Sequence, residues 1–433
     1  MANNKQDKIL NVPNKREQRQ TCLNVAERQA LRPKGSVPNK REQRNVPALR
    51  FPEFKGQWEN CRIKDFGKVV TGNTPPTANK ENYENGTKLW VSPSDLGDKK
   101  YIDNTKIKLS IKGYTQTRIL PKDSILVTCI GTIGKMGMAQ TELATNQQIN
   151  SIIVNHDFDK DFVYYSLMSR FPKYLSFIAI QVVPILSKSS FEKLENNYPS
   201  IEEQRKIGKF LDLIDARIAT QRKIIEKLES LIHGVVTTHF HRTRNKNTIT
   251  IKDLGKAYSV GNLSKEDLAE DGEPCILYGE LFTTYGCVAN KIQSRTNKYT
   301  QATLSRAGDL LFPASTTVDA ISLIAPTSLK TEGVYVAGDM FGIRIKSQYN
   351  SEYISYIINY VYNRKLSKYA QGSTIIHLHY ADIKNVTIQV PCLEEQNKCA
   401  DLLSCLQMKL DTERQLCVYF QKQKDYLLQQ MFI

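Results

Sequence analysis

Two long stretches of the chain repeat apolar residues every three and four positions, which predicts two long helices. A 3.5-residue repeat held over four heptads is typical of a coiled coil, and a polar residue interrupts both repeats at matching places, Gln221 and Glu413, with Lys424 interrupting the second again. We therefore expect the helices to pair with each other; the alternative is two surface helices that pack separately. The residues assigned to helix pairing are Leu211, Ile214, Ile218, Ile225, Leu228, Leu403, Leu406, Leu410, Cys417 and Phe420.

The two helical stretches begin alike, which indicates an internal repeat. PSIEEQRKIGKF starts at Pro199 and PCLEEQNKCADL at Pro391, an offset of 192 that also aligns Gln204 with Gln396. A second echo, IKDFGK at 63–68 and IKDLGK at 251–256, precedes each helix by more than a hundred residues. A repeat of this length is one structural unit used twice.

The segments between these landmarks read as mixed α and β structure. Short apolar runs at 124–129, 152–154, 309–312 and 341–345 predict strands, and residues 162–168 and 353–362 predict short helices at matching places. Turn residues gather at 72–76 and 85–86. The predicted division is a tail (1–44), a first recognition domain (45–198), a spacer helix (199–242), a second recognition domain (243–390) and a C-terminal spacer helix (391–433).

Connectivity predicts how the helices pair. The second globular segment joins the end of the first helix to the start of the second, and a helix of about 35 residues is about 50 Å long. Antiparallel pairing brings both attachment points to one end, so that a small domain need not span that length. The expected fold class is α+β: two globular domains separated by two long helices that form an antiparallel coiled coil, with a pseudo-twofold internal repeat and one domain at each end.

The charge favours a polyanionic partner. The net charge is +16, and residues 1–50 carry twelve Lys and Arg against four Asp and Glu. The tail also repeats VPNKREQR at 12–19 and 37–44 and restarts Asn-Val-Pro at 45–47. We interpret it as a disordered or partly helical extension; the functional alternative is an arm that binds phosphates without sequence preference.

Composition points to a cytoplasmic protein. The chain has no apolar run of 18 residues and no secretory signal, so we expect no membrane association. Its nine cysteines form no CxxC pair, which fits a reducing compartment.

Sequence motifs give no sign of catalysis. The chain has no N/D-P-P-Y/F methyltransferase motif and no GxxxxGK[S/T] phosphate loop, and residues 131–137 (GTIGKMG) have only GxxGxxG spacing. The pairs His239/His241 and His377/His379 lack a third ligand, so no metal site is expected. Spacing alone leaves a Glu-x-Lys nuclease cluster open. We predict a binding protein with no catalytic residues and no cofactor of its own.

Two similar basic segments suit a bipartite DNA target, because a duplex presents equivalent groove faces about every 34–36 Å. Reading base edges needs amide, hydroxyl and basic side chains, with Lys and Arg on phosphates. Suitable loops are 71–83 and 92–101 in the first segment and 285–299 and 314–318 in the second. The candidate DNA-binding residues are Thr74, Asn79, Lys80, Asn82, Tyr83, Ser92, Ser94, Lys99, Lys100, Tyr285, Lys291, Arg295, Lys298, Ser315, Thr316 and Thr317.

Over residues 45–433 the chain resembles the specificity subunits of Type I DNA restriction–modification systems. The matching stretches are VPALRFPEFKGQWE, TGNTPPTANKENYENGTKLWVSPSDLG, LYGELFTTYG, AGDLLFPAST, YAQGSTIIHLHYADIKNVTIQVP and both PxxEEQ helix openings. The resemblance implies two target-recognition domains, each reading half of an interrupted site in double-stranded DNA. It also implies helices that space these domains and dock methyltransferase subunits, two by expectation, and through them restriction subunits. S-adenosylmethionine, ATP and Mg²⁺ would bind those partners.

Two other classes of protein remain as alternatives. One is a stand-alone DNA endonuclease or methyltransferase with an unrecognised active site. The other is a coiled-coil regulator that binds DNA as a homodimer, which the internal repeat disfavours because one chain already supplies two similar halves. The recognised bases depend on loop geometry, which the sequence does not give.

Overall fold

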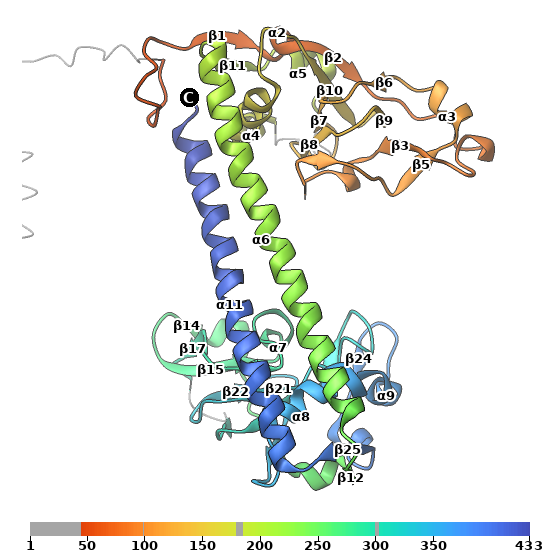
Figure 1. Ribbon diagram of the computed structural model, residues 1–433, viewed down its shortest axis with the longest axis vertical. Coiled ribbons are helices and arrows are strands. Elements are labelled where there is room, and N and C mark those ends of the chain that lie inside the picture. The colour runs from red at the N-terminus through yellow and green to blue at the C-terminus, as the bar shows by residue number, and fades with distance from the viewer. Residues whose placement is uncertain (1–44, 98, 179–184, 299–302) are drawn as a thin grey trace, which may run out of the picture. The chain divides into compact units, whose positions relative to one another are not determined.

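The computed structural model describes residues 45–433 apart from 98, 179–184 and 299–302 (Figure 1). The predicted tail, residues 1–44, lies outside the described residues. The chain forms two compact units: the first contains the described residues up to Lys209 together with Leu427–Ile433, and the second is Phe210–Tyr426. Both long helices, α6 (Ile201–Arg242) and α11 (Leu393–Gln430), contribute residues to both units.

The first unit contains a five-stranded sheet of order β2-β10-β7-β8-β4, a four-stranded sheet of order β5-β3-β9-β6 and the pair β1-β11. The strands are β1 (Glu59–Arg62), β2 (Gly67–Thr71), β3 (Lys88–Val91), β4 (Tyr101–Ile102), β5 (Ile107–Leu109), β6 (Ile119–Leu120), β7 (Ile125–Thr128), β8 (Met136–Ala139), β9 (Leu143–Thr145), β10 (Ile149–Val154) and β11 (Glu195–Tyr198). Its helices are α2 (Ile63–Phe66), α3 (Ile111–Thr115), α4 (Lys160–Ile178) and α5 (Lys188–Glu192), with 3-10 turns η1 (Lys80–Asn82) and η2 (Pro93–Asp95).

The second unit has two five-stranded sheets, of order β13-β23-β19-β21-β16 and β14-β17-β15-β22-β18, and the pairs β12-β25 and β20-β24. The strands are β12 (Lys246–Thr250), β13 (Gly255–Ser259), β14 (Leu268–Ala269), β15 (Glu273–Leu277), β16 (Val288–Ala289), β17 (Ser294–Thr296), β18 (Thr303–Leu304), β19 (Asp309–Pro313), β20 (Ser315–Thr316), β21 (Thr327–Leu329), β22 (Tyr335–Ala337), β23 (Met340–Ile345), β24 (Ile376–His377) and β25 (Thr387–Pro391). Its shorter helical elements are η3 (Ile251–Leu254), η4 (Lys265–Asp267), α7 (Glu280–Thr283), α8 (Ser351–Ile357), η5 (Ile358–Tyr362), α9 (Asn363–Leu366), η6 (Ser367–Tyr369) and α10 (Tyr380–Ile383).

The two units share a topology. The order β2-β10-β7-β8-β4 of the first matches β13-β23-β19-β21-β16 of the second, and in both the edge strand pairs in parallel with its neighbour. The central parallel pair of the other sheet also recurs, as β3-β9 and β15-β22. The repeat predicted from the helix openings therefore extends through the globular parts, whose sequences differ strongly.

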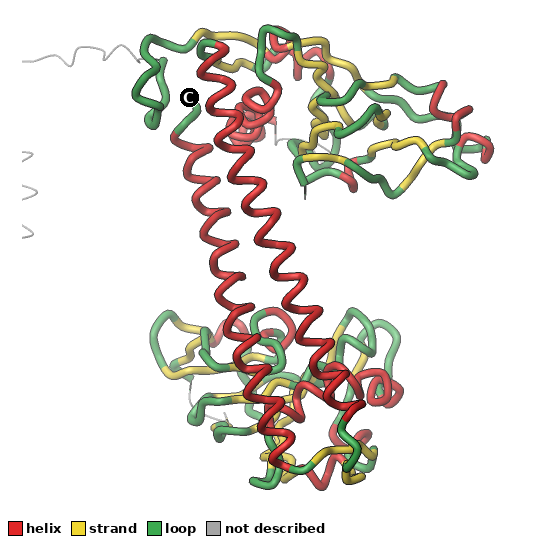
Figure 2. Tube along the Cα trace, in the orientation of Figure 1, coloured by secondary structure: helices red, strands yellow, loops and turns green. Residues whose placement is uncertain are grey.

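The predicted mixture of helix and strand is confirmed (Figure 2). The four predicted strands correspond to β7, β10, β19 and β23. The predicted helices at 162–168 and 353–362 exist but differ in form. The first lies within the 19-residue α4, which tolerates Pro172 in its interior. The second begins as α8 and continues as a π-helical segment, η5, where the backbone bonding widens by one residue.

In the second unit α6 and α11 run antiparallel. The Asp215 carboxylate lies 2.6 Å from the Lys424 ammonium, whereas farther along α6 the His239 ring lies 3.7 Å from the Glu395 carboxylate. Residue numbers therefore rise along one helix as they fall along the other. Of the residues assigned to pairing, Leu211, Ile218, Leu403 and Leu410 are buried, and Ile214, Ile225, Leu228, Leu406, Cys417 and Phe420 are half-buried.

The glutamine of each PxxEEQ opening ties its helix to the neighbouring globular part. In the first unit the buried Gln204 amide donates to the Pro199 carbonyl at 2.9 Å and accepts from the Asp159 backbone N–H at 3.0 Å. Asp159 in turn caps α4 by accepting from the Phe162 N–H at 2.8 Å. A buried amide that is bonded through both its nitrogen and its oxygen fixes the start of the long helix against α4.

The second unit repeats this arrangement residue by residue. Gln396 donates to the Pro391 carbonyl at 2.8 Å and accepts from the Asn350 N–H at 2.9 Å. Asn350 caps α8 through the Tyr353 N–H at 3.0 Å. The shared motif is thus a structural clamp, which explains why it recurs in segments that otherwise differ.

Candidate nucleic-acid interface

Two loops meet beside the short β20-β24 pair of the second unit. In this pair Ser315 lies opposite His377 and Thr316 opposite Ile376. The loop after β20 exposes Thr317 and Val318, and the loop before β24 exposes Ile375. The imidazoles of His377 and His379 stack with ring centroids 6.2 Å apart. Hydroxyl, imidazole and apolar groups exposed together are the side-chain types that read base edges and thymine methyl groups.

The first unit has an equivalent pair of segments. Ile130 forms an isolated antiparallel bridge with Ile185, which the 192-residue offset aligns with His377. The adjacent loop, residues 131–135, carries the exposed Thr132 and Lys135. None of the DNA-binding residues predicted from the sequence lies within 131–137, so this surface was missed. The sheet topology, and not the 192-residue offset, pairs this loop with the loop after β20: β7 and β19 hold the same place in their sheets, and each loop follows its strand.

Several of the predicted DNA-binding residues lie exposed on loops and strand ends. Lys99 and Lys291 are exposed, and the structure gives neither an ion pair with another described residue. Arg295 donates to the Gly272 carbonyl at 2.8 Å, and Lys298 forms an ion pair with Asp267 at 2.9 Å. Tyr299, which ends the predicted loop 285–299, lies outside the described residues. The exposed members of the predicted set are Lys80, Ser94, Lys99, Lys291, Arg295, Lys298 and Thr317.

Lys100 and Asn82, by contrast, must be removed from the predicted set. The Lys100 side chain is 5% exposed; its ammonium lies 2.6 Å from the Asp161 carboxylate and 4.5 Å from the centroid of the Tyr165 ring. Asn82 is fully buried, donates to the Pro76 carbonyl at 3.0 Å and accepts from the Gln116 amide at 2.9 Å. Both side chains are committed to the interior of the first unit.

Tyr83, Tyr285 and Ser315 are corrected for the same reason. The Tyr83 hydroxyl donates to the Pro75 carbonyl at 2.7 Å, and burial raises the pKa of that phenol. Tyr285 is 9% exposed, and its hydroxyl accepts from the Gln293 N–H at 3.0 Å. Ser315 is buried within β20. Sequence composition does not distinguish these side chains from exposed ones, because turns use the same polar residues to hold their own backbone.

The remaining candidates are half-buried and stabilise turns. Ser92 donates to the Asp95 carboxylate at 2.7 Å, and Asn79 accepts from the Glu81 N–H at 3.1 Å. Thr74 donates to the Gln147 side chain, and Thr316 accepts from the Val318 N–H at 3.2 Å. Each shapes a candidate loop without presenting its full side chain to solvent.

Among the described residues, no group of three or more His, Cys, Asp and Glu side chains is arranged to hold a metal ion. His239 lies instead between α6 and α11: its Nδ1 is 3.4 Å from the Tyr353 hydroxyl, and burial lowers the pKa of its ring. In the same part of the chain no helix is long and apolar enough to cross a bilayer.

Comparison with protein families gives one family twice. The Type I restriction modification DNA specificity domain matches residues 55–230 and again residues 244–417. The two matched ranges follow the two halves of the repeat, each ending within one of the long helices.

Similar chains carry corresponding names. The specificity subunit of the MjaIX Type I restriction enzyme from Methanocaldococcus jannaschii is 34% identical over 40% of this chain and 41% of that protein. The HindI subunit from Haemophilus influenzae is 35% identical over 34% of this chain and 32% of its own length. This chain therefore aligns with less than half of either relative. The MjaVIII subunit from M. jannaschii is 23% identical over 89% of this chain and 93% of its own.

A solved structure shares the fold. The S subunit of a Type I restriction-modification system from M. genitalium superposes with a TM-score of 0.57 at 14% identity, covering 90% of this chain and 99% of that chain.

Proposed function

Since the chain belongs to the Type I restriction modification DNA specificity family, we propose that it is the DNA-recognition subunit of such a system and does no chemistry itself. Each unit reads one half of an interrupted site in double-stranded DNA. The observation that carries the proposal is one topology used twice, with loops exposed at corresponding places beside Ile130–Ile185 and β20-β24.

Half-site reading rests on the exposed groups of those loops. Thr317 and the imidazoles of His377 and His379 supply hydrogen-bonding groups in the second unit, and Thr132 and Lys135 do so in the first. The loops differ in sequence between the units, so the two half-sites differ. Lys99 and Lys291 contact phosphates, because each is exposed and forms no ion pair with another described residue, so its ammonium is available to displace counterions from DNA.

The long helices dock methyltransferase subunits, two by expectation, and through them restriction subunits. In the second unit α6 and α11 expose large apolar side chains, among them Leu213, Met408 and Tyr419, the last 63% exposed. Large apolar side chains left exposed are the groups that protein association buries. S-adenosylmethionine, ATP and Mg²⁺ bind those partners, and the complex acts on cytoplasmic DNA.

Methylome sequencing tests the proposal. A host with the intact system should carry methylated bases in a bipartite motif, and deleting this gene should remove them. Replacing residues 243–390 with the second recognition domain of another family member should change one half of that motif and leave the other. A hybrid that changes both halves would contradict independent reading. DNA cleavage or methylation by the purified chain alone would overturn the assignment.

A further inference from the structure

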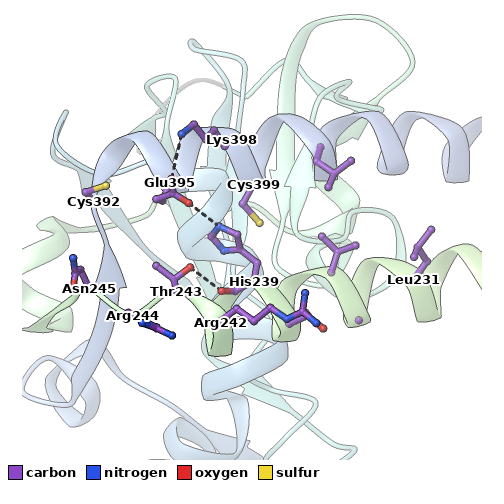
Figure 3. A pocket seen from close by; sticks show the side chains of 14 residues that line it. Leu231, His239, Arg242, Thr243, Arg244, Asn245, Cys392, Glu395, Lys398 and Cys399 are labelled. Atoms are coloured by element: carbon purple, nitrogen blue, oxygen red, sulfur yellow. Dashed lines mark hydrogen bonds and ion pairs between the residues drawn. The ribbon is translucent and has the colours of Figure 1, made fainter.

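An open hollow of about 890 Å³ lies between the end of α6 and the start of α11 in the second unit (Figure 3). Glu395 lines it, 3.2 Å from the Lys398 ammonium and 3.7 Å from the His239 ring. Leu231 and Leu402, each about half exposed, add apolar surface. A groove with a carboxylate, an ammonium and apolar side chains is equipped to hold an extended peptide.

In the first unit the equivalent residues are covered. The 192-residue offset aligns Glu395 with Glu203 and Lys398 with Lys206. Glu203 is 1% exposed because Arg50 lies over it, donating from Nε at 2.8 Å and from Nη2 at 2.7 Å to the two carboxylate oxygens. A two-pronged arginine–carboxylate contact of this kind is strong and specific in orientation.

Arg50 belongs to residues 45–58, a segment that lies across both helix ends in the first unit. The Leu49 N–H donates to the Gln430 carbonyl of α11 at 2.8 Å. The Lys206 ammonium lies 4.5 Å from the centroid of the Phe51 ring and pairs with Glu53. This segment, defined here as the strap, fills the groove between α6 and α11 in that unit.

Among its described residues the second unit has no strap. In the first unit residues 45–58 lead into β1 and the IKDFGK stretch, whereas in the second α6 ends at Arg242 and β12 begins at Lys246. The Glu395 side chain therefore remains 39% exposed, against 1% for Glu203. The hollow corresponds to the groove that the strap covers in the first unit, and no described residue takes the place of the strap there.

The chain carries further copies of the strap's first residues. Aligning Asn11-Val12-Pro13 with Asn45-Val46-Pro47 places Arg16 at the position of Arg50. We propose that residues 11–17 of the chain's own tail bind the groove of the second unit, with Arg16 on Glu395 and Glu17 beside Lys398. The tail thus acts as a second strap.

The sequence selects the first tail repeat over the second. Asn11-Val12-Pro13 reproduces the Asn-Val-Pro with which the strap begins, whereas Ser36 precedes Val37-Pro38 in the second repeat. Arg41 follows Val37 at the spacing at which Arg16 follows Val12, which makes it the matched comparison for Arg16.

Alkylation of Cys392 in the full-length chain tests the proposal. Cys392 is exposed and lines the groove, whereas the exposed Cys405 of the same helix does not line it. A strap bound for about nine-tenths of the time slows modification of Cys392 about tenfold, as followed by peptide mass spectrometry with Cys405 as internal reference. Arg16→Glu should restore fast modification, and the matched control Arg41→Glu should not.

A charge exchange separates binding from a loss of fold. Glu395→Arg alone should restore fast modification, and Glu395→Arg combined with Arg16→Glu should slow it again. Equal rates in the intact chain and Arg16→Glu would overturn the proposal, as would slowing by Arg41→Glu or failure of the combined variant. Protection that grows with protein concentration would assign the strap to a second copy and overturn binding within one chain.

Discussion

The amide of Gln221 donates to the backbone carbonyl of Glu413 at 3.2 Å and to its carboxylate, between α6 and α11 in the second unit. The two residues are also each other's counterparts in the repeat, 192 positions apart. In two antiparallel helices related by a pseudo-twofold axis, only residues beside the axis meet their own counterparts. The pair therefore marks the axis, and it sets the register because a shift by one heptad would bury both polar groups unpaired.

Leucine substitutions should separate stability from register. Glu413→Leu leaves the buried Gln221 amide without its main acceptor and should lower the free energy of unfolding in urea. Adding Gln221→Leu should recover that loss, because both polar groups are replaced by apolar ones. The double variant should lose its preference for one register, seen as new pairs in cysteine cross-linking along α6 and α11. A double variant as unstable as Glu413→Leu would contradict this account.

The helix pair should also weaken in acid. Hydrogen bonds from Lys409 first, and then from Gln221, hold the pKa of Glu413 below its usual range. A carboxyl whose pKa is depressed on folding contributes stability that is present above its unfolded pKa, about 4.3, and lost as pH falls through the folded value. Urea midpoints measured between pH 7 and pH 3 should fall less in Glu413→Gln than in the unaltered chain. If the urea midpoints of the two proteins fell in parallel with pH, the Glu413 carboxylate would contribute nothing to the stability of the helix pair.

Gln204 and Gln396, the glutamines of the two PxxEEQ clamps, should each contribute more to the free energy of unfolding than neighbouring residues do. Gln204→Ala or Gln396→Ala leaves a buried carbonyl and a backbone N–H unpaired, at a cost of about 1–3 kcal/mol in urea unfolding. Glutamate at either position should not substitute, because a carboxylate cannot donate to the Pro199 or Pro391 carbonyl. Glu394→Ala, at an exposed position two residues from Gln396, is the control and should stay within about 0.5 kcal/mol.

Sequence periodicity was sufficient to predict the two long helices and the polar pair, Gln221 and Glu413, that interrupts them. The spacing of apolar residues along a helix indicates which of its faces is buried. It also located the strands whose residues are continuously apolar, such as β7. It did not predict whether a single polar side chain in a turn is exposed or buried. Asn82 and Lys100 are of residue types that often contact DNA, yet both side chains lie in the interior. Their partners, Gln116 and Asp161, are 34 and 61 residues away, and only the fold brings them together.

Lys99 and Lys100 are adjacent in the first unit, and comparing their variants tests whether Lys100 is correctly excluded from the DNA interface. Lys100→Ala leaves the Asp161 carboxylate without its buried counter-ion and should destabilise the chain by about 3 kcal/mol. At temperatures where the variant stays folded, its DNA affinity and the dependence of that affinity on salt should match those of the unaltered chain. Lys99→Ala removes an exposed cation, so stability should hold while affinity falls for all sequences and the salt slope drops by about one unit. The measurements are urea unfolding and fluorescence anisotropy with duplex DNA from 50 to 200 mM salt. If Lys100→Ala lowered the salt slope while the protein stayed folded, Lys100 would return to the DNA interface.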